Sequence, residues 1–425
     1  MRVVVWGTGQ TGLNTAREMI KQGHEVRLVD EKPAQAGLDL PVTLLSKDDM
    51  LWADLVIPSP GIPKHHPMLG LAKKVLSEVE VASSLLTGTL IAITGTNGKT
   101  TTTTLIHQIL CRAGLDAGIG GNISPPLISL VERNPRYVVA EISTFQMEWI
   151  ERFRPHIGVC LNITPDHLDR YRDMDEYVLY KKIMFKNQEE GDIAVLNDDD
   201  PYLKDVGGRA RRAGFSFSSP SSQDGAFIQG SRIFFKGSIE GPGPLLPQDR
   251  ELGNGLKEDM LASALVARLL DIDSEAAQEV FAAFPGIHHR YEHVATIDGV
   301  TFVDDSKATN VGALETALSG MQSRVILILG GKDKGGDFSH IAKRFREKIR
   351  LAVVLGEAAG RIRQEIEDFV ETEAATDMQQ AVRTAFEKAE SGDTVLLSPG
   401  CASFDMFNSY AHRGDVFRQC VYSIR

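Results

Sequence analysis

The chain has 425 residues, which predicts two to four domains because a single hydrophobic core rarely grows to this size. Its composition, 42% hydrophobic and 24% charged residues, is that of an ordinary soluble protein, and its net charge of −11 argues against general nucleic-acid binding. No apolar run approaches the length of a membrane span, no secretory signal is expected, and four scattered cysteines predict reduced thiols in a cytoplasmic protein.

The N-terminal region predicts a strand–turn–helix unit that binds phosphate. The expected elements are a strand at 3–6, a helix near 11–22 and a strand at 25–29. Gly7, Gly9 and Gly12 in the turn have the G-x-G-x-x-G spacing of dinucleotide-binding folds, and Asp30 follows where a ribose-binding acid would stand. A lone pattern of this kind also arises from chance or close helix–strand packing. It therefore predicts a phosphate-bearing ligand without identifying it.

A second phosphate loop, T-G-T-N-G-K-T-T, follows a predicted strand at 90–94, after an earlier strand that ends in the stiff turn of "LVIPSPGIP" at 55–63. A glycine-rich turn before a helix gathers backbone N–H groups and the positive end of the helix dipole. Lys99 can reach the outer phosphates, and the Thr100 hydroxyl can ligate Mg²⁺. The strict motif has glycine where Ile93 stands, so this is a variant loop whose first glycine is Gly95.

The helix after this loop is predicted to end at Gly114, and its apolar face to comprise Leu105, Ile106, Ile109, Leu110 and Ala113. Further strands are expected at 137–143, 156–164 and 192–197. Glu141 stands at the carboxyl end of the first of these, where functional groups of open α/β sheets collect, and suits a Mg²⁺ ligand. A structural ion pair is the alternative.

The next strand end is crowded with potential metal ligands: Asn162, Asp166, His167 and Asp169. A loop histidine with a purely structural role is the alternative for His167. A short helix follows in "EYVLYKKIMF", where only one of the adjacent Lys181 and Lys182 can face the site. From the residues alone, Lys181 is interpreted as a solvated lysine.

Residues 236–250 are expected to form a long exposed connection, and a third region of alternating strands and helices begins near residue 288. Its predicted strands are 300–304, 324–329, 351–355 and 394–398, which indicates another open parallel sheet. Three strand ends are rich in glycine, lysine and hydroxyl groups: "VDDSKATN" at 303–310, "GGKDKGGDF" at 330–338 and "SPGCASFDMFNSY" at 398–410. Together they predict a pocket for a small anionic ligand.

The predicted fold class is therefore α/β with three domains. We expect a Rossmann-like domain at 1–85, a P-loop-type mononucleotide-binding domain at 86–287 and a Rossmann-like open sheet at 288–425. Hinges are expected near the two boundaries, so that the C-terminal domain can close over the nucleotide.

The motifs together resemble those of the Mur ligases, the ATP-dependent amino-acid ligases of peptidoglycan precursor synthesis. The resemblance runs in order along the whole chain, through "TGTNGKTTT", "AEISTFQ", "NITPDHLDRY", "GIHHRYE", "DDSKATN" and "LLSPGCASFDMF". These strings match the glutamate-adding branch, and "DSKATN" is the most diagnostic of them. The resemblance implies that the N-terminal loop holds the uridine diphosphate of a sugar substrate and not NAD.

The resemblance also implies a role for individual residues. The UDP-sugar contacts would be Gln10, Thr11, Asp30, Lys32, Ser59, Gly61 and Asn122. The ATP contacts would be Gly95, Thr96, Asn97, Gly98, Lys99, Thr100, Thr101, Arg290 and Asp305. The metal ligands would be Thr100, Glu141, His167 and Lys181, the last of them as a carbamate. The catalytic residues would be Lys99, Glu141, His167 and Lys181. His167 would also be a candidate base that removes a proton from the amine of D-glutamate. The D-glutamate pocket would comprise Lys307, Thr309, Lys334, Ser403 and Tyr410.

Three positions depart from the family pattern. Leu256 and Asp259 stand where relatives carry asparagines at the adenine, so how adenine is held is open. Tyr410 replaces the phenylalanine of some relatives.

The activity implied is the addition of D-glutamate to UDP-N-acetylmuramoyl-L-alanine through an acyl phosphate, with ATP as co-substrate and two Mg²⁺ ions. A cytoplasmic monomer without nucleic-acid or membrane partners is expected. Three alternatives remain: a ligase of the same fold for another amino acid or for a folate, an NAD-dependent oxidoreductase built on the first loop, and a P-loop binding protein without ligase chemistry.

Overall fold

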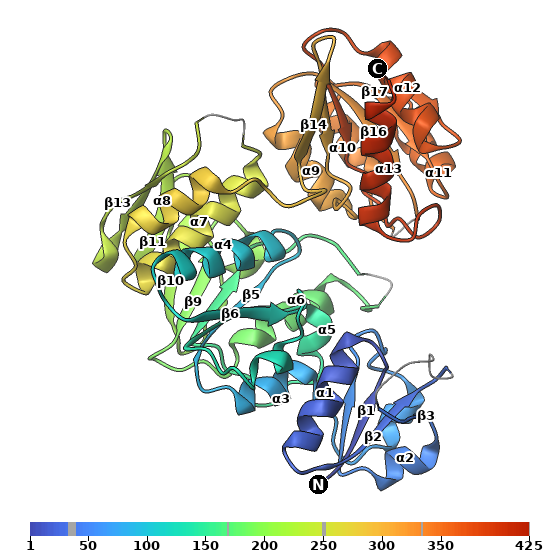
Figure 1. The fold of residues 1–425 in the computed structure, drawn as a ribbon. Coiled ribbons are helices and arrows are strands. Elements are labelled where there is room, and N and C mark those ends of the chain that lie inside the picture. Colours follow the sequence, from blue (N-terminus) through green and yellow to red (C-terminus); the bar gives the residue numbers. More distant parts are fainter. Residues whose placement is uncertain (33–39, 168–169, 249–251, 333–334, 425) are drawn as a thin grey trace. The chain divides into compact units, whose positions relative to one another are not determined.

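The computed structural model describes residues 1–32, 40–167, 170–248, 252–332 and 335–424 (Figure 1). They pack as two compact units. The first comprises Met1–Ile163, Asp175–Pro247 and Glu258–Ala282, and the second Thr164–Met174, Gln248–Lys257 and Ala283–Arg425. The first unit holds two sheets and the second holds one.

The N-terminal sheet of the first unit is parallel, with the strand order β3-β2-β1-β4. Its strands are β1 (Arg2–Trp6), β2 (Glu25–Asp30), β3 (Val42–Leu44) and β4 (Leu55–Pro58). The helical segments that pack around it are α1 (Gln10–Lys21), α2 (Lys47–Trp52) and η1 (Pro67–Leu71). Helix α3 (Glu78–Leu85) follows in the chain and packs against the short helical turn η2 (Leu127–Leu130). Because β2 and β4 flank β1, the direction of winding changes at β1, and ligands of open sheets bind beyond such a switch point.

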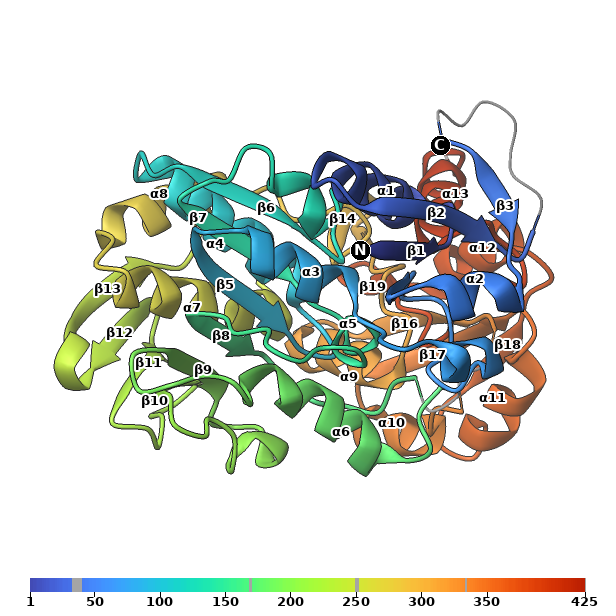
Figure 2. The same cartoon turned by 90° about the horizontal axis from the view of Figure 1, so that it is seen from below.

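The second sheet of this unit has nine strands in the order β13-β12-β11-β10-β9-β8-β5-β7-β6, with β5 well inside it (Figure 2). Its first five strands are β5 (Thr89–Thr94), β6 (Ala117–Gly121), β7 (Tyr137–Glu141), β8 (Ile157–Cys160) and β9 (Ile193–Asn197). The others are β10 (Arg211–Ser216), β11 (Asp224–Gln229), β12 (Arg232–Lys236) and β13 (Gly241–Leu245). The β11–β12 and β12–β13 pairs are antiparallel, and the other pairs of this sheet are parallel. The switch point is β5, between β7 and β8.

The helical segments of this part are α4 (Lys99–Arg112), η2 (Leu127–Leu130), α5 (Thr144–Met147), α6 (Met174–Lys182), η3 (Ile183–Phe185), η4 (Pro201–Leu203), η5 (Gly237–Ile239), α7 (Asn254–Leu269) and α8 (Ser274–Ala283). Helix α4 packs on β5, β6 and β7 through Leu105, Ile106, Ile109 and Leu110, which are buried as predicted. Ala113 is exposed, contrary to the prediction, because it lies just beyond the last helical residue.

The prediction of an exposed connection at 236–250 is wrong for its middle part. Residues 241–245 form β13, which pairs antiparallel with β12, and Gly243 and Pro244 are buried. Proline is tolerated in a strand at a sheet edge, where its missing N–H would face no neighbour. The sequence GPGPL does not alternate between apolar and polar residues, so its pattern does not predict a strand.

The second unit is one six-stranded sheet with helices on both faces. Its strands are β14 (Glu292–Ile297), β15 (Val300–Asp304), β16 (Val325–Gly330), β17 (Ile349–Leu355), β18 (Thr372–Ala374) and β19 (Thr394–Leu397), in the order β14-β15-β19-β16-β17-β18. Its helices are α9 (Val311–Gly320), α10 (Phe338–Phe345), α11 (Ala359–Ile366), α12 (Met378–Lys388) and α13 (Tyr410–Tyr422). The sheet is parallel as predicted, except that β14 runs antiparallel to β15 at the edge.

Two hydrophobic cores hold this sheet between its helices. Leu318, Phe338 and Ile362 place α9, α10 and α11 in one core, and Val382 and Phe417 place α12 and α13 in the other. The three polar strand ends singled out from the sequence belong to β15, β19 and β16, which are direct neighbours. The structure thus brings the three ends together, and the pocket for a small anionic ligand stays a prediction.

Candidate functional site

The strongest site feature of the first unit is the loop between β5 and α4. Gly95 and Gly98 have φ angles of 152° and 84°, which side chains other than glycine rarely allow. Lys99 Nζ donates to the carbonyl oxygens of Gly95 and Thr96, each at 2.8 Å. The lysine thus lies folded over the loop whose N–H groups would receive phosphates, next to the N-terminus of a 14-residue helix.

The end of β8 supports this loop from the neighbouring strand. Asn162 accepts from the backbone N–H of Asn97 at 2.9 Å and donates to Glu258 Oε1 at 2.8 Å, while its carbonyl oxygen accepts from the N–H of Thr96. The Asn162 amide thus has a structural role in the loop, and its role as a metal ligand stays a prediction. Asp169 lies outside the described residues.

Glu141 at the end of β7 has the properties of a cation ligand. Its side chain is 3% exposed, and its register partner on β5 is Ile93, two residues before Gly95. Oε1 accepts from Asn122 Nδ2 at 2.7 Å. Oε2 is buried and has no hydrogen-bond partner among the residues that the structure describes. An orphaned anionic oxygen in a buried place fits a divalent cation, which would offset its desolvation.

Lys181 on α6 is buried, with 2% of its surface exposed, whereas Lys182 is partly exposed. Only one of the two lysines faces inward, as predicted, but the interpretation of Lys181 as solvated is wrong. Its Nζ lies 4.7 Å from the centre of the Tyr177 ring, and the Tyr177 hydroxyl lies 3.1 Å from Thr96 Oγ1 in the phosphate loop. Burial raises the pKa of Cys160 at the end of β8 to about 12, and the charges of Lys181 and Lys99 oppose that shift. Both lysines therefore act on the same strand end.

His167 and Asp166 belong to the second unit, where Asn310 Nδ2 donates to Asp166 Oδ2 at 3.1 Å. His167 has a φ of 56°, and its own N–H donates to Asp166 Oδ1. Glu141, Lys99 and Lys181 belong to the first unit. The role of His167 as a metal ligand stays a prediction.

The N-terminal loop is shaped by its glycines and by Asp30. A Cβ on Gly7, whose φ is 119°, would lie 2.1 Å from Ser59 Oγ, so the turn after β1 fits closely against the turn after β4. Asp30 accepts from the Thr8 N–H and hydroxyl, at 2.9 and 2.8 Å, and from the Lys32 N–H. Burial raises the pKa of Asp30, but these hydrogen bonds outweigh it and lower the pKa below the usual value.

Most of the other residues expected to contact UDP are at least partly exposed at the surface of the first unit. Gln10, Lys32, Gly61 and Asn122 are exposed, and Thr11 is partly exposed. Gln10 Oε1 accepts from Ser124 Oγ at 3.2 Å, which places the N-terminal loop beside the segment after β6 that carries Asn122. Within the first unit, these residues are thus drawn from two sheets.

The polar strand ends of the second unit form one hydrogen-bonded network. Asp305 accepts from Ser398 Oγ at 3.0 Å and from the Tyr291 N–H at 3.2 Å. Burial raises its pKa to about 7, against the effect of these bonds and of the Arg290 charge. Lys307 Nζ lies 3.8 Å from the centre of the Tyr410 ring.

Among the other expected D-glutamate contacts, Ser403 is buried and Thr309 is partly exposed, while Lys334 lies outside the described residues.

Sequence reasoning missed Arg413, a fully buried guanidinium on α13. Its Nε and Nη2 donate to the Ser306 hydroxyl and carbonyl oxygens at 3.0 and 2.8 Å, and its Nη1 donates to the Cys401 carbonyl at 3.1 Å. It ties together the loops after β15 and β19, and its burial lowers its pKa to about 10. An arginine at a helix start carries no sequence signal that it is buried.

Comparison with known proteins gives three matches to family models in chain order. The Mur ligase MurD-like N-terminal domain matches residues 1–82, the Mur ligase middle domain 93–239, and the Mur ligase glutamate ligase domain 289–401. The chain belongs to the Mur ligase family. This confirms the resemblance and leaves the oxidoreductase alternative without support.

Curated relatives and solved structures of Mur ligases are similar to this chain over almost its whole length. UDP-N-acetylmuramoylalanine--D-glutamate ligases of Geobacter metallireducens and Pelotomaculum thermopropionicum are 40% and 39% identical, over 99% and 100% of this chain and 97% and 98% of theirs. The pseudomurein peptide ligase type C of Methanothermus fervidus shares the fold with a TM-score of 0.66 and 19% identity over the whole of both chains. MurF ligase of Thermotoga maritima, in complex with ADP, has a TM-score of 0.64 and 16% identity over 100% of this chain and 95% of its own.

The departure from the Mur ligase pattern at Asp259 has a structural consequence. Asp259 Oδ1 accepts from Thr102 Oγ1 on α4 at 2.9 Å, and a Cβ on Gly98 would lie 2.2 Å from it. The carboxylate of Asp259 thus packs against the phosphate loop. Leu256 is partly buried in the second unit.

Proposed function

We propose that this chain is an ATP-dependent ligase that joins D-glutamate to UDP-N-acetylmuramoyl-L-alanine in the synthesis of peptidoglycan precursors. The observation that carries the proposal is the phosphate loop at the β5 switch point, with Lys99 folded over it and an orphaned Glu141 oxygen on the next strand. Relatives of about 40% identity, which match this chain over almost their whole length, are named as UDP-N-acetylmuramoylalanine--D-glutamate ligases, and this name supports the choice of substrates.

The chemistry required is the activation of a carboxylate, whose leaving group would otherwise be oxide. In the proposed reaction the alanine carboxylate attacks the γ-phosphate of ATP, giving an acyl phosphate and ADP. The D-glutamate amine then attacks the acyl carbon and phosphate leaves. Phosphoryl transfer depends mainly on positioning and on neutralising charge, which Lys99 and Arg290 would provide.

Two Mg²⁺ ions belong to this proposal. Thr100, Glu141, His167 and a carbamylated Lys181 would hold them, and bound Mg²⁺ would neutralise charge on the phosphates. The buried position of Lys181 and the unpartnered Glu141 oxygen support the fit. His167 is kept as the candidate base for the amine.

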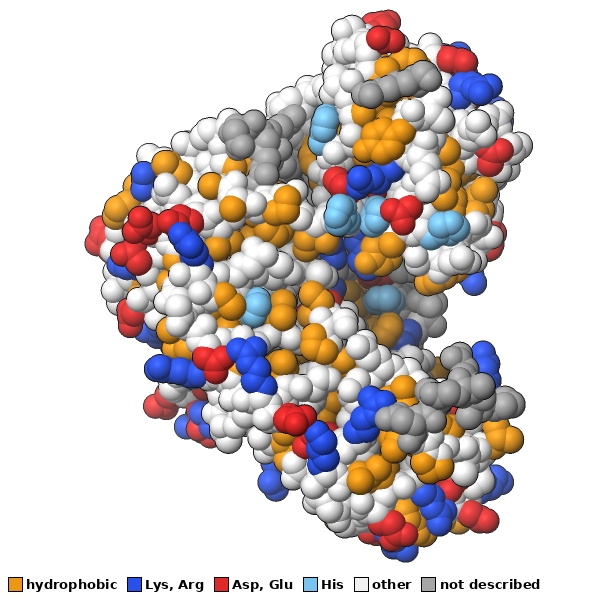
Figure 3. Space-filling view, viewed as in Figure 1, with side chains coloured by type: hydrophobic (Ala, Val, Ile, Leu, Met, Phe, Trp, Pro, Cys, Tyr) orange, Lys and Arg blue, Asp and Glu red, His pale blue; other side chains and the backbone are white. Residues whose placement is uncertain are grey.

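The other parts of the proposal concern the whole chain. We place the domains at 1–85, 86–287 and 288–425, the UDP-sugar at the first, ATP at the second and D-glutamate at the third, in a cytoplasmic monomer. No helix among the described residues is long and apolar enough to cross a membrane. On the face drawn in Figure 3, acidic and basic side chains are interspersed.

The deciding experiment is phosphate release from ATP, Mg²⁺ and UDP-N-acetylmuramoyl-L-alanine, with D-glutamate, L-glutamate, L-lysine or diaminopimelate added singly. Release with D-glutamate alone, with a matching mass gain on the nucleotide-sugar, is the expected result. Lys99→Met should lower the rate at least about a hundredfold, since one preorganised charge is removed from the transferred phosphoryl group. Gln108→Ala, at an exposed position of the same helix, is the control. Release with another amino acid would overturn the choice of substrate, and no release would favour the binding-protein alternative.

A further inference from the structure

The turn that carries Arg290 has an unusual backbone. His289 and Tyr291, on either side of Arg290, have φ angles of 64° and 48°. Both lie in the left-handed region, which residues other than glycine, asparagine, aspartate and histidine seldom occupy, so Tyr291 is the more unusual of the two. Such conformations persist where the surrounding contacts determine them, and they concentrate at functional sites. Contacts of the turn with its neighbours should therefore fix this backbone conformation.

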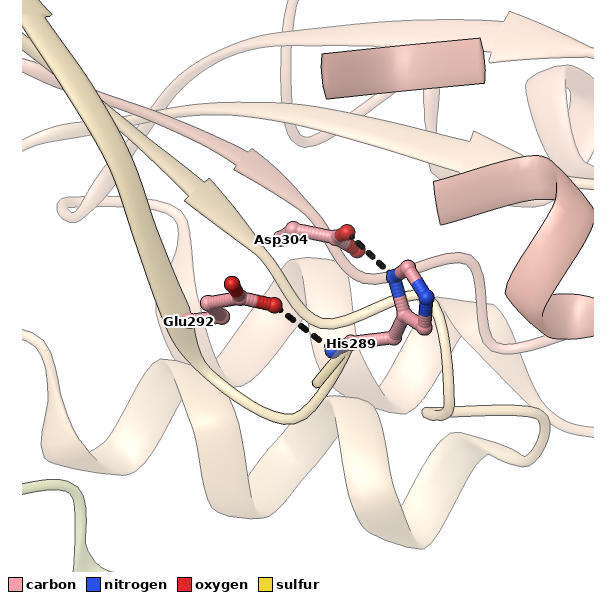
Figure 4. A group of neighbouring side chains, drawn as sticks. All are labelled: His289, Glu292 and Asp304. Atoms are coloured by element: carbon pink, nitrogen blue, oxygen red, sulfur yellow. Dashed lines mark hydrogen bonds and ion pairs between the residues drawn. The ribbon is translucent and has the colours of Figure 1, made fainter. Parts of the chain in front are cut away.

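Three carboxylates accept hydrogen bonds from the turn among the described residues, and Figure 4 shows two of these bonds. His289 Nδ1 lies 2.8 Å from Asp304 Oδ2, and the backbone N–H of His289 donates to Glu292 Oε2 at 2.9 Å. The N–H of Tyr291 donates to Asp305 at 3.2 Å. Two of the three acceptors are therefore the consecutive aspartates at the end of β15.

The His289–Asp304 pair is enclosed by α13. His289 is 7% exposed and Asp304 is fully buried. A Cβ on Gly414 would lie 2.1 Å from His289 Nδ1 and 2.7 Å from Asp304 Oδ2. Only glycine at this place lets the helix lie so close to the pair, so the imidazole has little freedom to leave its acceptor.

The side chains of His289, Glu292 and Asp304 also offer ligand atoms within 4.8 Å of one another, close enough for a metal ion. Their oxygen atoms are already engaged, however. Asp304 Oδ1 accepts from the Ser306 N–H, Glu292 Oε1 accepts from Arg418, and the remaining two accept from His289. An arginine bonded to the cluster further disfavours a cation. A hydrogen-bonded pair explains the arrangement better than an ion.

We propose that the His289–Asp304 hydrogen bond is a positioning device that holds Arg290 in register with Asp305 for the nucleotide. The inference rests on the proposed function, in which Arg290 and Asp305 contact ATP. His289 precedes Arg290 and Asp304 precedes Asp305, so one side-chain bond joins the two backbone segments immediately beside both nucleotide contacts. The backbone bond from the Lys307 N–H to the His289 carbonyl, at 3.0 Å, joins the same two segments. His289 acts through Arg290 and does not itself touch the substrate.

The test compares steady-state constants of full-length variants. His289→Ala removes the bond and should raise KM for ATP about tenfold, as the loss of one hydrogen bond to a charged group does. The KM for UDP-N-acetylmuramoyl-L-alanine should change less than about twofold. His289→Asn should stay near the unmodified protein, because the asparagine amide can replace Nδ1–H and asparagine tolerates the left-handed conformation. His288→Ala, at an 80% exposed side chain next door, is the matched control.

A double-variant cycle distinguishes positioning from general destabilisation. If His289 acts through Arg290, His289→Ala should have no further effect on KM for ATP in an Arg290→Ala background. If His289→Ala does not fold, His289→Gln, whose amide cannot reproduce Nδ1–H, takes its place in the cycle. Melting temperatures of all variants show which of them fold.

The outcomes distinguish a failure of the proposed nucleotide contact from a failure of the positioning role. An Arg290→Ala variant with unchanged KM for ATP would overturn the proposed nucleotide contact. Suppose that Arg290→Ala raises KM for ATP. If His289→Ala then leaves this KM unchanged, or raises it by the same factor with and without Arg290→Ala, the positioning role would be overturned and the proposed function would stay intact. Equal losses in His289→Ala and His289→Asn would also overturn it.

Discussion

Glu141 has one carboxylate oxygen held by Asn122 and a second that is buried without a described partner. The free energy of burying an unpaired anionic oxygen is unfavourable by several kcal/mol unless a cation or a proton accompanies it. At the scale of single residues, this atom is the clearest sign of where a metal would bind. Neither motif nor spacing in the sequence reveals that the oxygen is buried and orphaned.

Glu141→Gln tests this residue. The variant keeps an acceptor for Asn122 but loses an anionic ligand, so the Mg²⁺ concentration for half-maximal activity should rise about tenfold or more. Without Mg²⁺ its melting temperature should equal or exceed that of the unmodified protein, because an unpaired buried charge has been removed. Titration of activity with Mg²⁺ and thermal unfolding measure the two effects. Glu132→Gln, at an exposed carboxylate, is the control, and an unchanged Mg²⁺ dependence with lower stability would indicate a structural role instead.

Helix α3 shows at the scale of elements how a buried acid joins two parts of the first unit. Glu78 in its first turn is 2% exposed and accepts from the backbone N–H of Ile128, in η2, at 2.6 Å. Its Oε2 has no hydrogen-bond partner among the described residues. Burial raises the pKa of Glu78 to about 7, against the hydrogen bonds from Ile128 and Leu127. The carboxyl group is therefore mainly protonated below about pH 7 and mainly ionised above it.

This raised pKa predicts a pH dependence of stability. The folded state binds more protons than the unfolded chain between the unfolded pKa of about 4.5 and the folded value of about 7, so the free energy of unfolding falls as pH rises through that window. Glu78→Gln removes the charge and keeps the acceptor. The difference in free energy of unfolding between Glu78→Gln and the unmodified protein should therefore be larger at pH 8 than at pH 5. The increase, in favour of the variant, should be up to about 3 kcal/mol.

Urea unfolding at the two pH values measures this difference. Glu25→Gln, at an exposed position of β2, is the control. A stability difference between Glu78→Gln and the unmodified protein that is the same at both pH values would contradict the prediction.

At the scale of the whole molecule, the proposed nucleotide contacts are divided between the two units. Lys99 and Thr100 belong to the first unit and Arg290 and Asp305 to the second. A nucleotide that contacts both must select one arrangement of the units from those available to the free protein. Addition of a non-hydrolysable ATP analogue, Mg²⁺ and the UDP-sugar should therefore narrow the distribution of interatomic distances in small-angle X-ray scattering.

Lys99→Met, expected to weaken nucleotide binding, should show a smaller change at the same ligand concentration. Identical scattering of the unmodified protein with and without saturating ligands would contradict a nucleotide shared by the two units.

The fold was predictable where periodicity or a motif marks an element. The strand–loop–helix around Lys99 and the alternating elements of the second unit follow from local apolar patterns, which act over a few residues. Strand β13 could not be predicted, because GPGPL pairs only through the edge that β12 offers. For the same reason the burial of Lys181 is not predictable from the sequence: it depends on a distant part of the chain, the end of β8, as well as on Tyr177 one helical turn before it.

The sequence by itself determined the α/β class, the family and the positions of the chemically active loops, since these are encoded in short runs of residues whose spacing is local. Only the tertiary structure decided how those loops work together. It brought the ends of β15, β19 and β16 side by side, joined His289 to Asp304 and Asp259 to Thr102, and left one oxygen of Glu141 without a partner. These features depend on strand order and on burial, which are set by the packing of the whole chain and not by any single segment.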